Sequence, residues 1–300
     1  MKAAEFVQFR TADGLTLPGL LFAPAGGTKV AIYLHGNGSS SVFYKENYEL
    51  AHKLNEGGVA VLFFNNRGAH LIKKLDVWKN GRTERKFFGM AYEKIKDCVI
   101  DIEAAVAFLK ARGYGEFYLI GVSTGANKIC VYDHYRPKNA VKKYVSVCGG
   151  DDTGIYYQLF GKEKFNTLLR KAEEKVEKGL GEELIGELMP ADFFSYRAFY
   201  DTADPNGDYN VFPFYEVINK VKLSRKPLFR YFKAIKKPTL VVYGALDEYA
   251  WGDVPRAVAI LKRYQPGFEY AIVPGADHGF TGKDTKLART VSSYIINSRV

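Results

Sequence analysis

The sequence predicts an α/β protein with a mainly parallel central sheet and helices on both of its faces. Short apolar runs that suit buried strands alternate along the chain with segments in which apolar residues recur every three or four positions, as on one face of a helix. Turns containing glycine directly follow several of the apolar runs, at residues 35–40, 65–68 and 148–150. Because the strands of such a sheet end at one common edge, we expect these turns to carry functional residues.

The expected elements begin with a hairpin and continue as alternating strands and helices. The turn Ala12-Asp13-Gly14 favours a tight connection between the first two strands. Apolar side chains spaced by three or four positions make the helix before Gly113 the most regular one. We expect strands at residues 5–10, 15–22, 29–34, 59–64, 117–120, 141–147, 239–243 and 269–273, and helices at residues 43–55, 92–110, 126–135, 254–264 and 285–297.

The strand and helix rhythm stops between residues 151 and 235. This segment contains a charged helical stretch at 162–178 and an aromatic, turn-rich stretch at 191–215. The sequence therefore predicts residues 1–150 and 236–300 as two parts of one core, with residues 151–235 inserted as a cap or lid. Aromatic side chains of the insertion are expected either to line a pocket or to hold the cap on the core; they are Phe160, Phe165, Phe193, Phe194, Tyr196, Phe199 and Tyr200.

Composition places the chain among soluble globular proteins. Of its 300 residues, 47% are hydrophobic and 25% are charged, which suffices for a full core. The formal charge of +10 is spread along the chain among acidic residues, so we expect no nucleic-acid partner. Long-range attraction of anionic substrates is an alternative consequence of that charge, and with the cap aromatics it suggests aromatic or anionic esters.

The cysteines and the N-terminus bear on cofactors and compartment. Cys98, Cys130 and Cys148 each lie in an apolar stretch, which indicates reduced core residues. The sequence has no C-x-x-C pair or Cys/His cluster, so we expect no metal and no cofactor. Without an apolar signal segment at the start or a run long enough to span a membrane, the prediction is a cytoplasmic protein; its oligomeric state is left open.

A candidate nucleophile lies between an expected strand and an expected helix, in Gly121-Val122-Ser123-Thr124-Gly125. In this G-x-S-x-G pattern, the small residues allow a sharp turn that brings the strand close to the helix. The turn exposes the serine hydroxyl at a helix N-terminus, where backbone N–H groups stabilise developing negative charge. We predict Ser123 as the nucleophile; the alternative is a tight structural turn with an ordinary serine.

A serine nucleophile needs a base that a carboxylate orients, and histidine is the usual base. His278 lies in the loop after the last expected strand, which brings it to the same sheet edge as Ser123. Asp247 lies in the loop after the preceding strand and is the expected acid. Asp151 and Asp152 also follow a strand and are alternatives, because topology alone does not fix which strand supplies the acid.

Acyl transfer also needs two N–H donors aimed at the oxyanion. The residue after the nucleophile, Thr124, is expected to supply one of them. The loop His35-Gly36-Asn37-Gly38 is expected to supply the other, because its glycines let the backbone approach a substrate. Asn37 is the expected donor and Gly38 the alternate, and a glycine-rich turn without a ligand role is the remaining interpretation.

Together these segments make the chain resemble the α/β-hydrolase superfamily over nearly all of residues 1–150 and 236–300. Relatives often carry D-x-R-G at residues 65–68, where this chain has Asn65, and that position usually supports the loop. A narrower likeness, through residues 64–68, 89–93 and the serine turn, is to a poorly characterised esterase-like branch that includes fungal siderophore esterases. The resemblance implies the α/β-hydrolase fold, with nucleophile, acid and base in the order found here.

The function predicted from the sequence is cleavage of a small-molecule carboxylic ester by a serine hydrolase. Ser123 would attack the carbonyl, His278 would relay the proton and Asp247 would orient the imidazole. A thioesterase, amidase, acyltransferase or carbon–carbon bond hydrolase would use the same residues. A ligand-binding protein of this fold without catalysis is the alternative from outside the enzymes.

Overall fold

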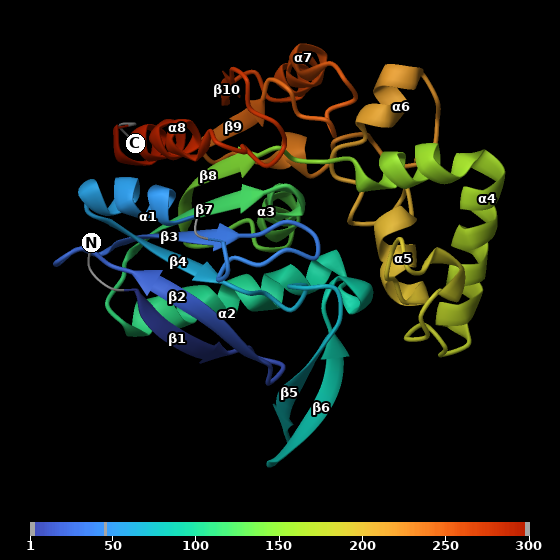
Figure 1. Ribbon diagram of the computed structural model, residues 1–300, viewed down its shortest axis with the longest axis horizontal. Helices are drawn as coiled ribbons and strands as arrows, with labels where there is room; N and C mark the ends of the chain where they lie inside the picture. The colour runs from blue at the N-terminus through green and yellow to red at the C-terminus, as the bar shows by residue number, and fades with distance from the viewer. Residues whose placement is uncertain (1–3, 45–46, 298–300) are drawn as a thin grey trace.

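The computed structural model describes residues 4–44 and 47–297 of the chain. The central sheet contains β1 (Glu5–Arg10), β2 (Thr16–Phe22), β3 (Lys29–Leu34), β4 (Val59–Phe64), β7 (Glu116–Val122), β8 (Val141–Val147), β9 (Thr239–Gly244) and β10 (Glu269–Val273). Its strands lie in the order β1-β2-β4-β3-β7-β8-β9-β10 (Figure 1). β2 pairs antiparallel with β1 and β4, and the pairs from β4 to β10 are parallel. The prediction of a mainly parallel α/β sheet is confirmed.

Helices alternate with these strands as the sequence predicts. They are α1 (Asn47–Glu56), α2 (Cys98–Ala111), α3 (Thr124–Tyr135), α7 (Val254–Tyr264) and α8 (Asp284–Asn297). α1 packs beside α8, and α2 packs beside α3 (Figure 1). All six residues of β4 and of β9 are buried, so both faces of the sheet are covered. The helix expected at 43–55 is α1, and residues 45 and 46 of that expectation lie outside the described residues.

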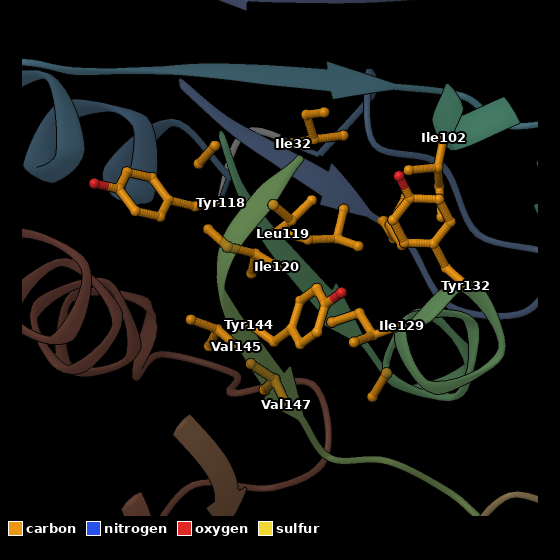
Figure 2. Close-up of a cluster of buried hydrophobic side chains, with 14 of the residues drawn as sticks. Ile32, Ile102, Tyr118, Leu119, Ile120, Ile129, Tyr132, Tyr144, Val145 and Val147 are labelled. Carbon is orange, nitrogen blue, oxygen red and sulfur yellow. The ribbon is translucent and has the colours of Figure 1, made fainter. Parts of the chain in front are cut away.

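The strand that leads to Ser123 runs through the hydrophobic core. Tyr118, Leu119 and Ile120 of β7 are 2% exposed or less. In Figure 2, Leu119 points toward Ile129 and Tyr132 of α3, the helix that follows the serine, and Tyr118 points away from that helix. Full burial of such a side chain stabilises a fold by roughly 1.5–3 kcal/mol. The turn at Ser123 therefore joins two elements that packing holds firmly.

A second, two-stranded sheet was not expected from the sequence. β5 (Lys73–Lys79) and β6 (Arg82–Phe88) form an antiparallel hairpin that projects from the body (Figure 1). The connecting residues Asn80 and Gly81 have φ of 52° and 79°, the left-handed values that a two-residue hairpin turn requires. The Asn80-Gly81 pair is a signal for such a turn. The hairpin was not predicted because the residues on either side are mostly charged and exposed, without the sustained apolar alternation of a strand.

The segment predicted as an insertion consists of helices between β8 and β9. They are α4 (Asp152–Glu177), η3 (Gly186–Leu188), α5 (Tyr196–Ala203), α6 (Phe214–Asn219) and η4 (Phe232–Ala234). α4 starts ten residues before the expected helix at 162–178, and it bends at Gly161, where φ is 71°. Figure 1 shows α4 and α5 at the end of the sheet where β7 and β8 point.

The insertion has two parts that differ in their packing. Residues from Tyr156 to Ala203, together with Met90, form a second hydrophobic cluster, which includes Phe165, Phe194 and Phe199. Residues from Tyr209 to Ile235 instead belong to the main core. The first part therefore has a hydrophobic core distinct from the main one and contacts the rest of the chain at Met90, Ala91 and Ile95, while the second part packs in the main core. Among the described residues, no helix has the length and apolar character needed to cross a membrane.

Candidate active site

The turn at Ser123 has the strained geometry expected of an exposed serine between a strand and a helix. Ser123 has φ of 56° and ψ of −126°, and it directly precedes α3. A Cβ added to Gly121 would lie 2.2 Å from the carbonyl oxygen of Gly125, and one added to Gly125 would lie 2.2 Å from that of Leu34. No side chain fits at that distance, which explains why glycine is needed at both positions. The serine hydroxyl lines a cavity at the C-terminal edge of the sheet.

His278 and Asp247 meet beside that cavity. The Nδ1 of His278 lies 2.9 Å from Oδ1 of Asp247, whose side chain is 1% exposed. Since the ionised carboxylate only accepts, Nδ1 carries the proton and Nε2 is left as an acceptor. Burial lowers the pKa of His278, but the carboxylates of Asp247, Glu248 and Asp152 outweigh it and raise the pKa above its usual value. His278 lines the same cavity as Ser123.

The other candidate acids have different positions. Asp151 caps α4, because its carboxylate accepts the amide hydrogens of Gly154 at 2.8 Å and Tyr215 at 2.7 Å. Asp152 faces the cavity and forms no contact with His278 comparable to that of Asp247. Sequence reasoning gave no role to Glu248, whose Oε2 accepts the backbone N–H of His278 at 3.1 Å and so helps to fix the histidine loop.

The loop after β3 packs directly on the serine. A Cβ on Gly36 would lie 2.9 Å from the Cβ of Ser123, so only glycine allows this approach. Asn37 lines the cavity, and Gly38 follows it with φ of 60°. Among the residues that the structure describes, the amides of Asn37, Gly38 and Thr124 donate to no other residue. These N–H groups are therefore available for a substrate, and the structure leaves the choice between Asn37 and Gly38 open.

His35 shapes this loop from inside. Its Nδ1 lies 2.8 Å from the carbonyl oxygen of Gly36, so Nδ1 is the donor and Nε2 an acceptor. Nε2 is buried without a partner among the described residues. Burial and the positive charge of Lys128 hold the pKa of His35 well below its usual value, so the ring stays neutral.

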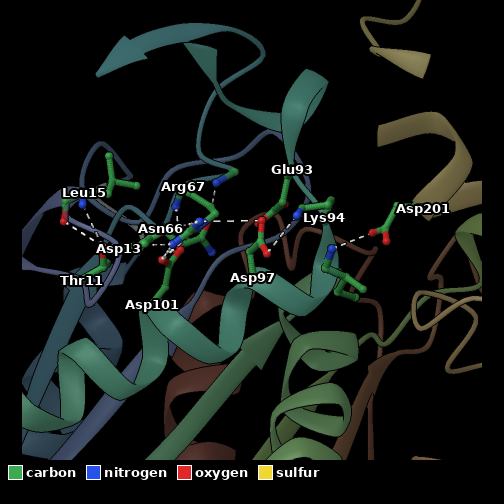
Figure 3. A network of polar contacts seen from close by, with 12 residues as sticks. Thr11, Asp13, Leu15, Asn66, Arg67, Glu93, Lys94, Asp97, Asp101 and Asp201 are labelled. Atoms are coloured by element: carbon green, nitrogen blue, oxygen red, sulfur yellow. Dashed lines mark hydrogen bonds and ion pairs between the residues drawn. The ribbon is translucent and has the colours of Figure 1, made fainter. Parts of the chain in front are cut away.

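Residues after β4 support the same loop from outside. Oδ1 of Asn65 accepts hydrogen bonds from the Ser41 amide at 2.8 Å and the Ser40 hydroxyl at 3.0 Å. An amide oxygen thus does here what a carboxylate would do. Arg67 is buried and binds Asp101 of α2 through Nη2 at 2.7 Å and Asp13 through Nη1 at 3.0 Å (Figure 3). Arg67 therefore ties the loop after β4 to α2 and to the turn between β1 and β2.

A buried ion pair connects this support to the helix of the nucleophile. Nζ of Lys128, on α3, lies 2.6 Å from Oε1 of Glu93, and the two side chains are 0% and 4% exposed. A Cβ on Gly68 would lie 2.0 Å from Oε2 of Glu93, so the carboxylate fills the space beside that glycine. Lys73 is close, and burial lowers its pKa to about 8.

A thiol lies next to the expected triad acid. Ligand atoms of Cys148, Asp247 and His278 all lie within 4.8 Å of one another. Burial, and then the charge of Asp247, raise the pKa of the Cys148 thiol well above its usual value. A metal would need a thiolate, which these surroundings oppose. The thiol suits a supporting contact to the carboxylate better than it suits a metal ligand.

The cavity at Ser123 has a volume of about 760 Å³, large enough for a small organic ester. The insertion contributes Ile155, Tyr156, Leu159 and Asp192 to its wall. Of the two roles expected for the aromatic residues from Phe160 to Tyr200, the structure shows packing and not pocket lining: none of them lines the cavity, and Phe165, Phe194 and Phe199 lie in the second hydrophobic cluster. Their pattern was that of a small hydrophobic core, which is how they are used.

The comparisons with known proteins bear on the fold. No protein-family model matches the chain, and no curated protein sequence matches it. Among solved structures, the ferulic acid-bound esterase Est1E of Butyrivibrio proteoclasticus is similar with a TM-score of 0.64 at 16% identity, covering 97% of this chain and 98% of that one. The carboxylesterase CesB of Bacillus subtilis gives a TM-score of 0.58 at 15% identity, covering 99% and 93%.

A third structure comes from an archaeon. The Pyrococcus furiosus esterase Pf2001 gives a TM-score of 0.56 at 18% identity, covering 97% of this chain and 90% of that one. The chain thus has the α/β-hydrolase fold that these bacterial and archaeal esterases share, as the sequence predicted. At such identities the likeness extends to the fold and not to individual residues.

Proposed function

We propose that the chain is a serine hydrolase that cleaves a carboxylic ester through Ser123, His278 and Asp247. The observation that carries the proposal is the 2.9 Å contact between His278 Nδ1 and Asp247, beside a cavity that also exposes Ser123. The contact fixes the tautomer in which Nε2 accepts a proton. The fold shared with carboxylesterases supports the same reaction class.

In the proposed reaction, Ser123 Oγ attacks the ester carbonyl while its proton passes to Nε2 of His278. The tetrahedral oxyanion accepts hydrogen bonds from the amide of Thr124 and that of Asn37 or Gly38. As the bond to the alcohol breaks, His278 gives its proton to the leaving oxygen and the acyl group stays on Ser123. Water then attacks the acyl-enzyme by the same steps, releasing the acid and restoring the serine.

The first part of the insertion acts as the cap in this proposal, because Ile155, Tyr156 and Leu159 of α4 form one side of the cavity. Small esters fit the volume, and the ferulic acid bound to Est1E shows that a protein of this fold holds a small aromatic acid. The narrower likeness to siderophore esterases stays a prediction. Thioesters, amides and carbon–carbon bonds are tested as competing substrates.

A fluorophosphonate probe tests the nucleophile, with the labelled peptide located by mass spectrometry. We expect labelling at Ser123, and its loss in His278→Ala and in Ser123→Ala. Hydrolysis of short and long nitrophenyl esters measures the reaction, and Ser123→Ala should lower kcat by roughly 10⁶, as removal of a triad serine does elsewhere. Ser292→Ala is the matched control, because that serine lies on α8 and away from the cavity.

The proposal fails if the folded protein takes up no probe at Ser123 and hydrolyses none of the esters. A probe that labels Ser123 without any ester turnover would instead direct the search to thioesters, amides and carbon–carbon bonds. These results separate an activated nucleophile from an inert serine in a binding protein.

A further inference from the structure

We propose that the cavity at Ser123 takes esters that carry a positively charged group, an inference that rests on the function proposed above. The sequence suggested negatively charged substrates instead, because the chain as a whole has a formal charge of +10. A bound substrate contacts the wall of the cavity, and the charged groups that line this wall are negative.

Carboxylates from three separate elements line the cavity. Asp152 comes from the first turn of α4, Asp192 from the loop before α5, and Asp284 from the first turn of α8. No lysine or arginine is among the described residues that line it. An anionic ester would therefore enter a space with like charges on several sides, while a cationic ester would find opposite charges there.

In the part of the chain that the structure describes, these carboxylates have no cationic side chain as a partner, although Asp192 interacts with the hydroxyl of Tyr156. No lysine or arginine forms an ion pair with Asp152, Asp192 or Asp284. Asp152 is partly buried, and burial raises its pKa to about 6 because the ionised form is poorly solvated there. Charged groups in such places are ordinarily paired. A cationic substrate group would supply a partner for Asp152, in the cavity that Ser123 and His278 also line.

Aromatic rings make the same wall suitable for an organic cation. Tyr156 and Tyr249 line the cavity with Asp152, and the Tyr249 ring lies 4.7 Å from the His278 ring, between centroids. Tyrosine rings attract ammonium groups through their electron-rich faces. A quaternary or primary ammonium group close to the ester bond satisfies both features of the wall.

Two esters of the same shape and different charge test the inference: 3-(trimethylammonio)phenyl acetate and 3-tert-butylphenyl acetate. After correction for their rates with hydroxide, kcat/KM should favour the cationic ester by roughly tenfold, the effect of one partly screened charge pair. Asp152→Asn should reduce that ratio most, and Asp192→Asn should reduce it in part. Glu163→Gln, which changes an exposed carboxylate of α4, should leave the ratio as it is.

Binding of the two parent phenols, 3-(trimethylammonio)phenol and 3-tert-butylphenol, is measured by calorimetry on the wild type and on Asp152→Asn. This arm does not depend on turnover, so it separates the two proposals. Tighter binding of the cation that weakens in Asp152→Asn supports the inference even if neither ester is hydrolysed, a result that would remove only the proposed function. An equal or weaker affinity for the cation, or a ratio that Asp152→Asn leaves unchanged, overturns it.

Discussion

Replacing Glu93 by glutamine is expected to destabilise the protein by about 3–5 kcal/mol, the usual cost of leaving one partner of a buried ion pair alone. Its carboxylate lies 2.6 Å from Nζ of Lys128, and neither side chain reaches solvent to any extent. Glutamine keeps the shape but not the charge, so the Lys128 ammonium would remain buried without a counterion. Lys73 adds to the cost, because its ammonium group is attracted by Glu93 and repelled by Lys128.

The opposite change, Lys128→Met, should cost less, about 1–3 kcal/mol. Glu93 then keeps an attractive partner in Lys73, and methionine fills much of the space of the lysine stem. The double variant Glu93→Gln/Lys128→Met removes both charges of the pair, so the Lys128 ammonium is no longer left without a counterion. Lys73 loses the attraction of Glu93 but keeps that of Asp101. The double variant should therefore lose less stability than the two single variants together, by an interaction energy of about 2 kcal/mol or more.

Urea unfolding followed by tryptophan fluorescence gives the free energy of unfolding of each variant, provided that circular dichroism reports the same transition. The control pair is Lys171 and Glu187, which lie 2.9 Å apart on the surface with almost half of each side chain exposed. Removing that pair should change stability by no more than about 0.5 kcal/mol. The reasoning would be refuted if the stability losses of the two single variants add up to that of the double variant, or if Glu93→Gln loses less than about 1 kcal/mol.

Further predictions concern pH, the serine turn and a buried acid. The kcat/KM for ester hydrolysis should rise with pH as His278 loses its proton, and this rise should lie above pH 6.5 because the neighbouring carboxylates raise the pKa of His278. In Asp152→Asn the rise should move to lower pH. A pH profile of kcat/KM that does not move would contradict this. Gly125→Ala puts a Cβ 2.2 Å from the carbonyl oxygen of Leu34 and should lower kcat/KM by about a hundredfold or more. Gly115→Ala is the control: its Cβ would meet no atom within 4 Å, and it should change kcat/KM by less than about twofold. Burial raises the pKa of Asp201 from 3.8 to about 7, so ionising its carboxyl group costs folding stability as the pH rises through this range. Urea unfolding should therefore show that Asp201→Asn stabilises the protein by about 1–2 kcal/mol at pH 8 and has almost no effect at pH 4. Equal effects at the two pH values would count against this prediction.

Local patterns explain why the core and the serine turn could be predicted from the sequence. The residues of β7 are a continuous apolar run, and the glycines around Ser123 are required by contacts within a few residues of it or with the adjacent strand. The sequence also placed His278 and Asp247 after successive strands, which parallel order brings to one edge. These features depend on short-range spacing and on sheet order, both of which the chain displays directly.

The choice among the possible acids depends on contacts that spacing does not encode. Asp151 and Asp152 are neighbours, yet one turns inward to cap α4 and the other faces the cavity. The capping role of Asp151 requires the amide of Tyr215, which lies far along the chain. In the same way, Lys128 sits in an ordinary helical pattern, and only the approach of Glu93 explains why its charge is tolerated inside.

The net charge of the chain does not predict the charge of the cavity wall, for a related physical reason. At physiological ionic strength, the influence of an exposed charge fades over about 8 Å, so the many surface lysines act weakly inside a lined cavity. Asp152, Asp192 and Asp284 are distant in sequence and come together through the insertion and the last helix. The insertion thus decides the charge of the site as well as its shape. Because the proposed nucleophile and base follow core strands, substrate preference is expected to follow changes in α4 and the loop before α5 more closely than changes in the sheet.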